Sequence, residues 1–299
     1  MVVHSTPNLF NILFSLKGSI AKKIAKRTFM ITALAAIIVL VESLYPSLFS
    51  QVSATPFTLL GISLSIFMSF RNNACYSRWW EGRQAWGKVI TDVRSFARAS
   101  EVIDDVTLRE KQLRSLCGYT HAMAAKLRGE NQYLAAKEWL SEEESAYGHH
   151  VCDGILRTIS RLNSQLAKNN HISEWRYVLL EEQLQRLSEA QASCERIKTT
   201  PVPYPYTLLF HRTTYIFCML LPFAMAEPLG WIAPIFTTIV SYAFFGLDAI
   251  GDELEDPFGR DENALPLDAL VRIIERDILD TLNVTELPPE KKPVGYILS

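Results

Sequence analysis

The chain has 299 residues, of which 48% are hydrophobic and 21% are charged, and its formal net charge is −2. Such averages are typical of a soluble globular protein, and the near-zero net charge says little about partners. No cluster of basic residues interleaved with aromatic ones suggests a nucleic-acid partner. The averages conceal a very uneven distribution of lysine and arginine. Neither residue occurs between Arg27 and Arg71 or between Arg212 and Arg260, although both are frequent elsewhere.

The first gap between basic residues is long enough for two helical crossings of a hydrocarbon core, each of which needs about 20 apolar residues. It is interrupted by turn-forming sequence that runs from Tyr45-Pro46 to Thr55-Pro56. We therefore expect a first transmembrane hairpin over residues 28–71. A cytoplasmic or interfacial segment is expected before it, over residues 1–27.

The middle of the chain, residues 72–206, is expected to be a cytoplasmic region built of helices. Apolar residues from Trp79 to Phe96 recur at helical spacing, and no glycine or proline occurs between Phe70 and Gly82. The second membrane span is therefore expected to run straight into this helix. Strand signals are almost absent, and the further helices are expected over residues 107–128, 131–143, 154–167 and 173–197.

The second gap predicts a second transmembrane hairpin over residues 207–250, which turns at Glu227-Pro228-Leu229-Gly230. Residues 251–299 then form a C-terminal cytoplasmic segment. Basic residues stand outside both ends of both gaps, so the positive-inside rule predicts that the N-terminus, the C-terminus and the central region are cytoplasmic.

The sequence gives little sign of catalytic or cofactor chemistry. It contains no nucleophile motif, phosphate-binding loop or zinc-protease pattern, so we expect neither an enzyme nor a cofactor. The cysteines are odd in number and widely spaced, which predicts free thiols rather than a disulfide framework. They are Cys75, Cys117, Cys152, Cys194 and Cys218.

The second expected span carries an apolar stripe. On a straight helix with Ile62 at zero, Ile66 lies at about 40° and Phe70 at about 80°, while Arg71 lies on the opposite side. Ser69 and Asn73 fall on the same stripe as the apolar residues. This pattern suits a hydrophobic pore neck that opens into a polar vestibule. The ordinary alternative is that these residues pack against other helices or face lipid.

Two motifs resemble the bestrophin family, and its bacterial branch most closely. The first is Ser69-Phe-Arg-Asn-Asn-Ala-Cys-Tyr-Ser-Arg-Trp-Trp-Glu-Gly-Arg83, with its Arg-Trp-Trp, and the second is the Asp-Pro-Phe-Gly at residues 256–259, inside an acidic run. The resemblance implies an all-α membrane protein with two transmembrane hairpins per subunit and a helical cytoplasmic region. It also implies a homopentamer around a central pore, in the bacterial inner membrane.

The resemblance also implies where the pore narrows. Counting back from Arg78, as the family motif counts from its arginine, reaches the stripe residues Phe70, Ile66 and Ile62. A second constriction, a cytoplasmic aperture upstream of the proline-rich entry to the third span, is expected near Leu180, beside Glu181 and Glu182.

A metal site is left open by the sequence. In animal relatives a run of acids after the Pro-Phe-Gly motif binds calcium, whereas here Arg260 interrupts the run. The candidate ligands that remain are Asp261 and Glu262, and calcium gating is not expected. The alternative is structural: Asp261 would cap a helix over residues 266–279, and Glu253 and Glu255 would pair with arginines of the cytoplasmic region.

The expected function is a channel for monovalent cations, sodium or potassium, with a hydrophobic gate. The resemblance implies this in part, since animal bestrophins pass anions whereas bacterial relatives resemble cation channels. In addition, the predicted stripe carries no basic residue, and Glu181 and Glu182 would raise the local cation concentration. The alternatives are an anion (chloride) channel of the same fold and a secondary transporter. The expected partners are monovalent ions, membrane lipid and further copies of the chain, with no nucleic acid.

Overall fold

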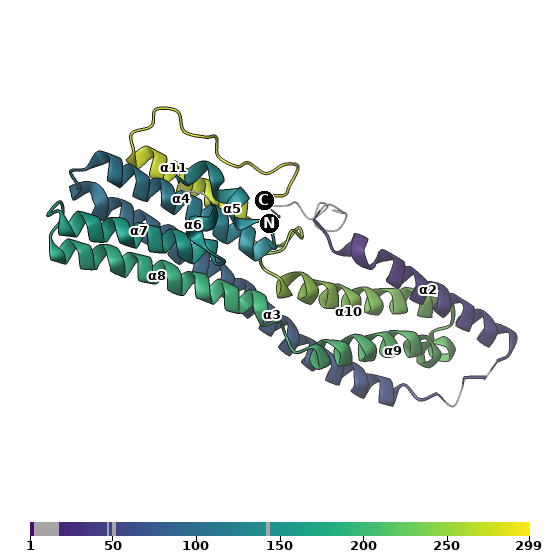
Figure 1. The fold of residues 1–299 in the computed structure, drawn as a ribbon. Coiled ribbons are helices and arrows are strands. Elements are labelled where there is room, and N and C mark those ends of the chain that lie inside the picture. Colours follow the sequence, from purple (N-terminus) through teal and green to yellow (C-terminus); the bar gives the residue numbers. More distant parts are fainter. Residues whose placement is uncertain (3–17, 47, 50–51, 142–143) are drawn as a thin grey trace. The chain divides into compact units, whose positions relative to one another are not determined.

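The computed structural model describes the chain except for residues 3–17, 47, 50–51 and 142–143 (Figure 1). The regular secondary structure of the described residues is helical, and isolated β-bridges occur there only between residues near the chain ends. The predicted all-helical fold is therefore confirmed. Most of the expected interfacial segment before residue 18 lies outside the described residues.

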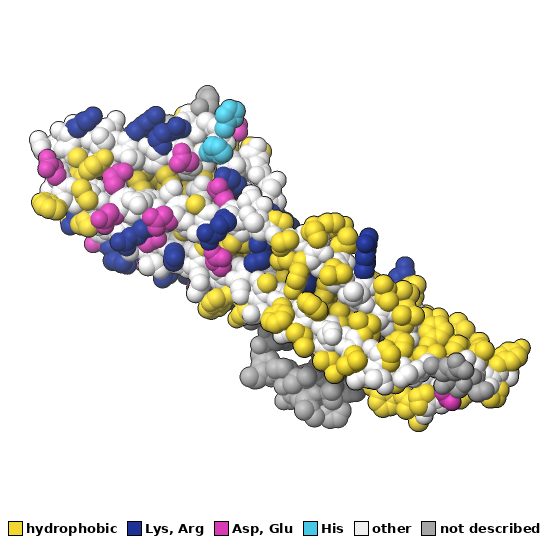
Figure 2. Space-filling view, turned by 90° about the horizontal axis from the view of Figure 1, so that it is seen from below, with side chains coloured by type: hydrophobic (Ala, Val, Ile, Leu, Met, Phe, Trp, Pro, Cys, Tyr) yellow, Lys and Arg dark blue, Asp and Glu magenta, His cyan; other side chains and the backbone are white. Residues whose placement is uncertain are grey.

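The described helices divide into two compact units. We call residues 4–79 and 201–256 the apolar unit, and residues 1–3, 80–200 and 257–299 the charged unit. Helix α3 contributes its first half to the apolar unit and its second half to the charged unit. In Figure 2, hydrophobic side chains cover most of the visible face of the apolar unit, whereas acidic and basic side chains are frequent on the charged unit.

The apolar unit contains α2 (Ala21–Leu44), the first half of α3 (Thr55–Ala99), α9 (Tyr204–Leu229) and α10 (Ala233–Glu255). Helices α2, α9 and α10 pack against one another. The α9–α10 connection turns at Gly230, whose φ of 53° lies in the left-handed region that glycine adopts without strain, and continues through η3 (Gly230–Ile232). The predicted turns of both hairpins therefore coincide with breaks between helices.

Apolar side chains from all four helices form the core of the apolar unit: Ile24, Ile31, Leu64, Met68, Phe210, Phe217, Cys218, Leu221, Phe245 and Ala249. Among the described residues, two stretches are long and apolar enough to cross a membrane, Ala21–Leu44 and Tyr204–Glu255. The apolar part of α3, residues 55–70, is shorter than either stretch, because Arg71 follows within the same helix.

The charged unit is a bundle of helices, and its buried apolar residues include Trp86, Phe96, Leu116, Tyr119 and Ile159. Helix α4 packs against both α7 and α11. Besides the second half of α3, the described elements of the charged unit are η1 (Ser100–Val102), α4 (Val106–Arg128), α5 (Gln132–Ala136), η2 (Lys137–Trp139), α6 (Glu144–Tyr147), α7 (Val151–Lys168), α8 (Glu174–Thr199) and α11 (Leu267–Thr281).

Side-chain caps explain where two of these helices begin. Asp105 accepts a hydrogen bond from the Leu108 amide at the start of α4, and Ser173 accepts one from the Arg176 amide at the start of α8. The predicted helices over 107–128 and 173–197 are confirmed to within two residues, whereas α7 starts three residues before the predicted 154 and ends one residue after the predicted 167.

Two local predictions are wrong. The single helix expected over residues 131–143 is instead α5 and η2, because Leu140 leaves the helix in an extended conformation and packs over Gly118, where a Cβ would lie only 2.7 Å from Leu140 Cδ2. Asp261 does not cap α11, which begins at Leu267 after Pro266 and has no side-chain cap.

Candidate functional site

Helix α3 exposes its predicted apolar stripe in the apolar unit. The exposed fractions of Ile62, Ile66 and Phe70 are 55%, 52% and 63%, and Ser69 and Asn73 are exposed beside them. The opposite face of the same helix carries the buried residues Leu64, Met68, Arg71 and Cys75. All five predicted stripe residues therefore lie on one surface. An exposed apolar surface of this kind contacts lipid, contacts other copies of the chain, or lines a narrow pore.

The same stripe also borders an apolar groove of about 480 Å³. Ile62 and Ile66 line this groove on α3, opposite Phe217 of α9 and Phe244 of α10. The small size of Gly61 contributes to the close packing, because a Cβ there would lie 3.2 Å from the Phe217 ring. Part of the stripe is thus available for helix packing, which is the alternative that the sequence left open.

Arg71 follows Phe70 directly and yet is completely buried. Its Nη1 donates to Asp248 Oδ1 at 3.0 Å, and its Nη2 donates to Asp252 Oδ1 at 2.5 Å and lies 3.7 Å from Glu255 Oε2. The guanidinium carbon also lies 5.4 Å from the centroid of the Phe210 ring. These contacts fix the rotation of α3 against α10 immediately after the predicted neck.

A glycine makes this contact possible. A Cβ on Gly251 would lie 2.6 Å from Asn72 Oδ1 and 2.8 Å from Arg71 Nη1, both closer than van der Waals contact allows. The amide of Asn72 is itself held, because its Nδ2 donates to the Leu247 carbonyl at 3.0 Å. Two consecutive polar residues of α3 therefore lie directly against the backbone of α10.

His211 completes the cluster around Asp248. Its Nδ1 lies 2.9 Å from Asp248 Oδ2, and its Nε2 lies 3.7 Å from Asp252 Oδ1. Within the described residues, these three form the one group with the spacing of a metal site. The Arg71 guanidinium already occupies both carboxylates, so the arrangement has the chemistry of an ion-pair network and not of a cation site.

The predicted aperture residues are placed differently from the expectation. Leu180 is completely buried, because α8 turns Leu180, Leu184 and Leu187 into the core of the charged unit. A pore-lining side chain must reach the surface, which Leu180 does not do in this subunit. The exposed apolar residues of the same region are Trp175, Val178 and Leu179.

The two acids beside Leu180 also differ from each other. Glu181 is partly buried and accepts hydrogen bonds from Ser160 Oγ and Asn163 Nδ2, both at 2.8 Å. Glu182 is exposed, and its Oε2 lies 3.9 Å from Arg186 Nη2. Of these two carboxylates, only that of Glu182 belongs to an exposed side chain.

The acids around residue 260 have partners of their own. Arg260 forms an ion pair with Glu130, and the Tyr296 hydroxyl donates to Glu262 Oε1 at 3.1 Å. The backbone carbonyl of Asp261 accepts from the Ala264 amide at 3.0 Å. Asp261 and Glu262 remain candidate ligands by residue type, and no described His, Cys, Asp or Glu joins them as a third ligand.

The two acids expected to pair with arginines lie in the apolar unit. Glu253 pairs with Lys23 at 2.7 Å, and Glu255 lies near Arg71. The sequence did not single out Asp248, although a lone acid in the apolar run from Phe244 to Ile250 was a detectable signal.

Comparisons with known proteins agree on one family. The family model described as "Bacterial/Fungal Bestrophin protein" matches residues 1–280. The chain is 36% identical over 296 residues to the voltage-dependent anion channel-forming protein mll4386 of Mesorhizobium japonicum, covering 98% of this chain and 95% of that protein. It is 32% identical over 298 residues to the voltage-dependent anion channel-forming protein YneE of Escherichia coli K12, covering 98% of each.

A solved structure is similar over most of its length. The crystal structure of a bacterial bestrophin homologue from Klebsiella pneumoniae, phased by Zn-SAD, superimposes with a TM-score of 0.83 at 33% sequence identity. The similarity covers 87% of this chain and 98% of that one.

Proposed function

The chain belongs to the bacterial and fungal bestrophin family, and on this basis we propose that it forms a pentameric ion channel in the bacterial inner membrane. Five copies of α3 surround a central axis in this proposal. The family is one of channels and not of enzymes, in agreement with the lack of catalytic motifs in the sequence.

The observation that carries the proposal is the two-sided character of α3. Ile62, Ile66 and Phe70 lie exposed on one face, whereas Arg71 is buried and ion-paired on the other. Because the buried contacts of Arg71 fix the rotation of α3, the exposed face with Ile62, Ile66 and Phe70 points in one fixed direction. Five copies of this exposed face around a symmetry axis form a narrow hydrophobic neck, and Ser69 and Asn73 add polar lining beside it.

We propose the membrane topology that the sequence predicts. Residues 28–71 and 207–250 form two hairpins, and residues 1–27, 72–206 and 251–299 are cytoplasmic. Two apolar stretches, Ala21–Leu44 and Tyr204–Glu255, support the first span and the second hairpin. The remaining crossing, by residues 55–70, is supported by the exposed apolar side chains of α3. Lipid is then the main partner of the outer surface.

For selectivity, we propose that anions such as chloride are the principal permeant ions. The curated relatives at 32% and 36% identity carry the name of voltage-dependent anion channel-forming proteins, which favours the anion alternative over the cation preference expected from the sequence.

Conduction of monovalent cations is the second candidate. It is supported by the absence of basic side chains among the five exposed stripe residues from Ile62 to Asn73, and by the exposed carboxylate of Glu182. A secondary transporter has less support, because the buried charges Arg71 and Asp248 are already paired with each other.

One experiment tests the proposal and separates these candidates. The purified chain is reconstituted in a planar bilayer with a tenfold gradient of potassium chloride, and its mass is measured in detergent. Discrete unitary currents from a pentamer are expected, with a reversal potential close to the chloride equilibrium potential. A reversal potential at the potassium equilibrium potential establishes the cation candidate. Saturable flux without unitary currents, or a monomer as the stable species, overturns the proposal of a pentameric channel.

A further inference from the structure

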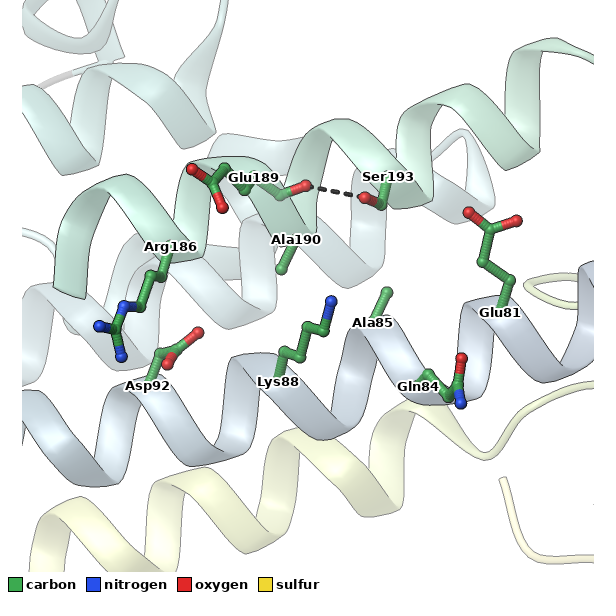
Figure 3. Close-up of a pocket in the computed structure, with 9 residues that line it drawn as sticks. All are labelled: Glu81, Gln84, Ala85, Lys88, Asp92, Arg186, Glu189, Ala190 and Ser193. Carbon is green, nitrogen blue, oxygen red and sulfur yellow. Dashed lines mark hydrogen bonds between the residues drawn. The ribbon is translucent and has the colours of Figure 1, made fainter. Parts of the chain in front are cut away.

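A charged cavity of about 470 Å³ lies within the charged unit, between α3 and α8 (Figure 3). Its size is in the range of roughly 300–1,000 Å³ that is usual for small-molecule sites. The charged side chains that line it are Glu81, Lys88, Asp92, Arg186 and Glu189. None of these residues belongs to the stripe or to the Arg71 cluster, so the cavity is separate from the proposed ion pathway through the neck.

Asp92 is the unusual member of this set. The residue is 7% exposed, and among the described residues no hydrogen bond or ion pair engages its carboxylate. Burial raises the pKa of the Asp92 carboxyl above its usual value, while the charges of Arg186 and Lys88 act in the opposite direction. The carboxylate of this largely buried residue has no partner in the described chain and lines the cavity, so we expect it to meet a ligand there.

The basic side chains of the cavity are also incompletely paired. Within the described part of the chain, no ion pair involves Lys88, and the one ion pair of Arg186 is the 3.9 Å contact with the exposed Glu182. Figure 3 shows Lys88 reaching from α3 toward α8, and Arg186 reaching from α8 toward the level of Asp92. As far as the structure describes the chain, the cavity therefore presents an unpaired carboxylate, an unpaired ammonium group and a guanidinium whose ion pair is long.

This mixture of charges selects the class of ligand. A simple anion would be attracted by Lys88 and Arg186 but repelled by Asp92 and Glu189. A metal cation would be attracted by the two carboxylates but repelled by the two basic side chains. A molecule with both charges satisfies all four groups at once. Gln84 and the Ser193 hydroxyl add neutral polar groups at the rim.

We propose that this cavity binds a small zwitterion, an amino acid or a similar solute with one ammonium and one carboxylate group. The ammonium group lies against Asp92 and Glu189, and the carboxylate lies between Lys88 and Arg186. The site is independent of the proposed ion selectivity, because it needs only the packing of α3 against α8 in the charged unit.

The test is calorimetric titration of the full-length chain in detergent with glycine and with β-alanine. Two single-charge analogues serve as matched probes: N-acetylglycine keeps only the carboxylate, and glycine methyl ester keeps only the ammonium group. We expect saturable binding of at least one zwitterion, and binding at least tenfold weaker for both analogues. No measurable binding of either zwitterion, or equal binding of a single-charge analogue, overturns the proposal.

Variants locate the site. Asp92→Asn is expected to weaken zwitterion binding at least tenfold, whereas the exposed Asp104→Asn leaves it unchanged. Arg186→Gln is a second variant at a side chain that is 57% exposed, so its folding is secure, and Arg161→Gln is its exposed control. If Asp92→Asn fails to fold, Arg186→Gln decides alone. Wild-type affinity in both cavity variants overturns the assignment of the site.

Discussion

Arg71 and Asp248 form an ion pair in which neither side chain is exposed to solvent, with 3.0 Å between Nη1 and Oδ1. The two residues are separated by 177 positions, and they join α3 to α10. Because Arg71 is the residue after Phe70, the pair controls which way the exposed stripe of α3 points. The surface proposed to line the pore is thus set by a contact on the opposite side of the helix.

Removal of Arg71 is expected to be strongly destabilising. Arg71→Met leaves the buried Asp248 with His211 at 2.9 Å and Arg27 at 4.0 Å, and breaking a buried pair from one side costs about 3–5 kcal/mol. The measurement is the thermal unfolding midpoint in detergent. The control is Arg114→Met, which removes an exposed pair with Glu110 and costs at most about 1 kcal/mol. Equal midpoints for the two variants would show that the pair does not stabilise the fold.

Gly251→Ala tests the close approach of α3 to α10. The added Cβ lies 2.8 Å from Arg71 Nη1, so the two helices have to separate or the guanidinium has to move. We expect a lower unfolding midpoint and altered unitary conductance. Gly246→Ala in the same helix is the matched control, because its Cβ lies 3.8 Å from Ile24 Cδ1, an ordinary contact. The explanation fails if Gly246→Ala is as disruptive as Gly251→Ala.

Alanine replacements on the stripe test the neck. Ile62→Ala, Ile66→Ala and Phe70→Ala are each expected to increase the current, because a wider and less apolar constriction is more easily wetted. Phe67→Ala is the control, since Phe67 is 56% exposed but lies about 140° around the helix from Ile62. Single-channel recording gives the conductance. If Phe67→Ala alone increases the current, the pore axis lies on another face of α3.

The acids of α8 are expected to differ in their effect on selectivity. Glu182→Gln removes an exposed charge and raises the permeability of chloride relative to potassium, most strongly at low ionic strength, where the field is least screened. Glu181→Gln has a smaller effect, because Ser160 and Asn163 already bind that carboxylate. Reversal potentials at two salt concentrations measure both variants. An equal shift for the two would mean that Glu181 is exposed to the conducting ions.

Calcium removal is expected to leave the current intact. Arg260 pairs with Glu130 and Glu262 accepts from Tyr296, so the acids of this segment are already engaged by the protein. Current recorded with a strong chelator on both sides is therefore expected to persist at a similar open probability. Loss of current in the chelator, recovery with calcium and renewed loss in Asp261→Ala would establish a gating site there.

The sequence predicted most of the helices and the turns of both hairpins, because local signals dominate them. The gaps in lysine and arginine located the apolar segments, Gly230 marked the turn between α9 and α10, and the lack of glycine or proline after Phe70 predicted the continuous α3. Periodicity also identified Ile62, Ile66 and Phe70 as one exposed face. Each of these features depends on residues within a few helical turns.

Features that depend on distant residues were not predictable in the same way. Arg71 resembled an exposed membrane-flanking arginine, because its partners lie on α10, far along the chain. Leu180 was chosen by counting along the chain from a family motif, but the side chains that α7 and α4 present to α8 decide which face of α8 is buried. The cavity around Asp92 likewise needs two helices that are remote in sequence.

The burial of every cysteine has a practical consequence for labelling. All five thiols are free and buried, and burial raises the pKa of Cys152 and Cys194 to about 12, so they stay protonated at neutral pH. Maleimide reagents need an accessible thiolate, and they find none among the native side chains. A single cysteine introduced at Trp175, which is 83% exposed, would therefore carry a fluorophore or spin label without prior removal of the native cysteines.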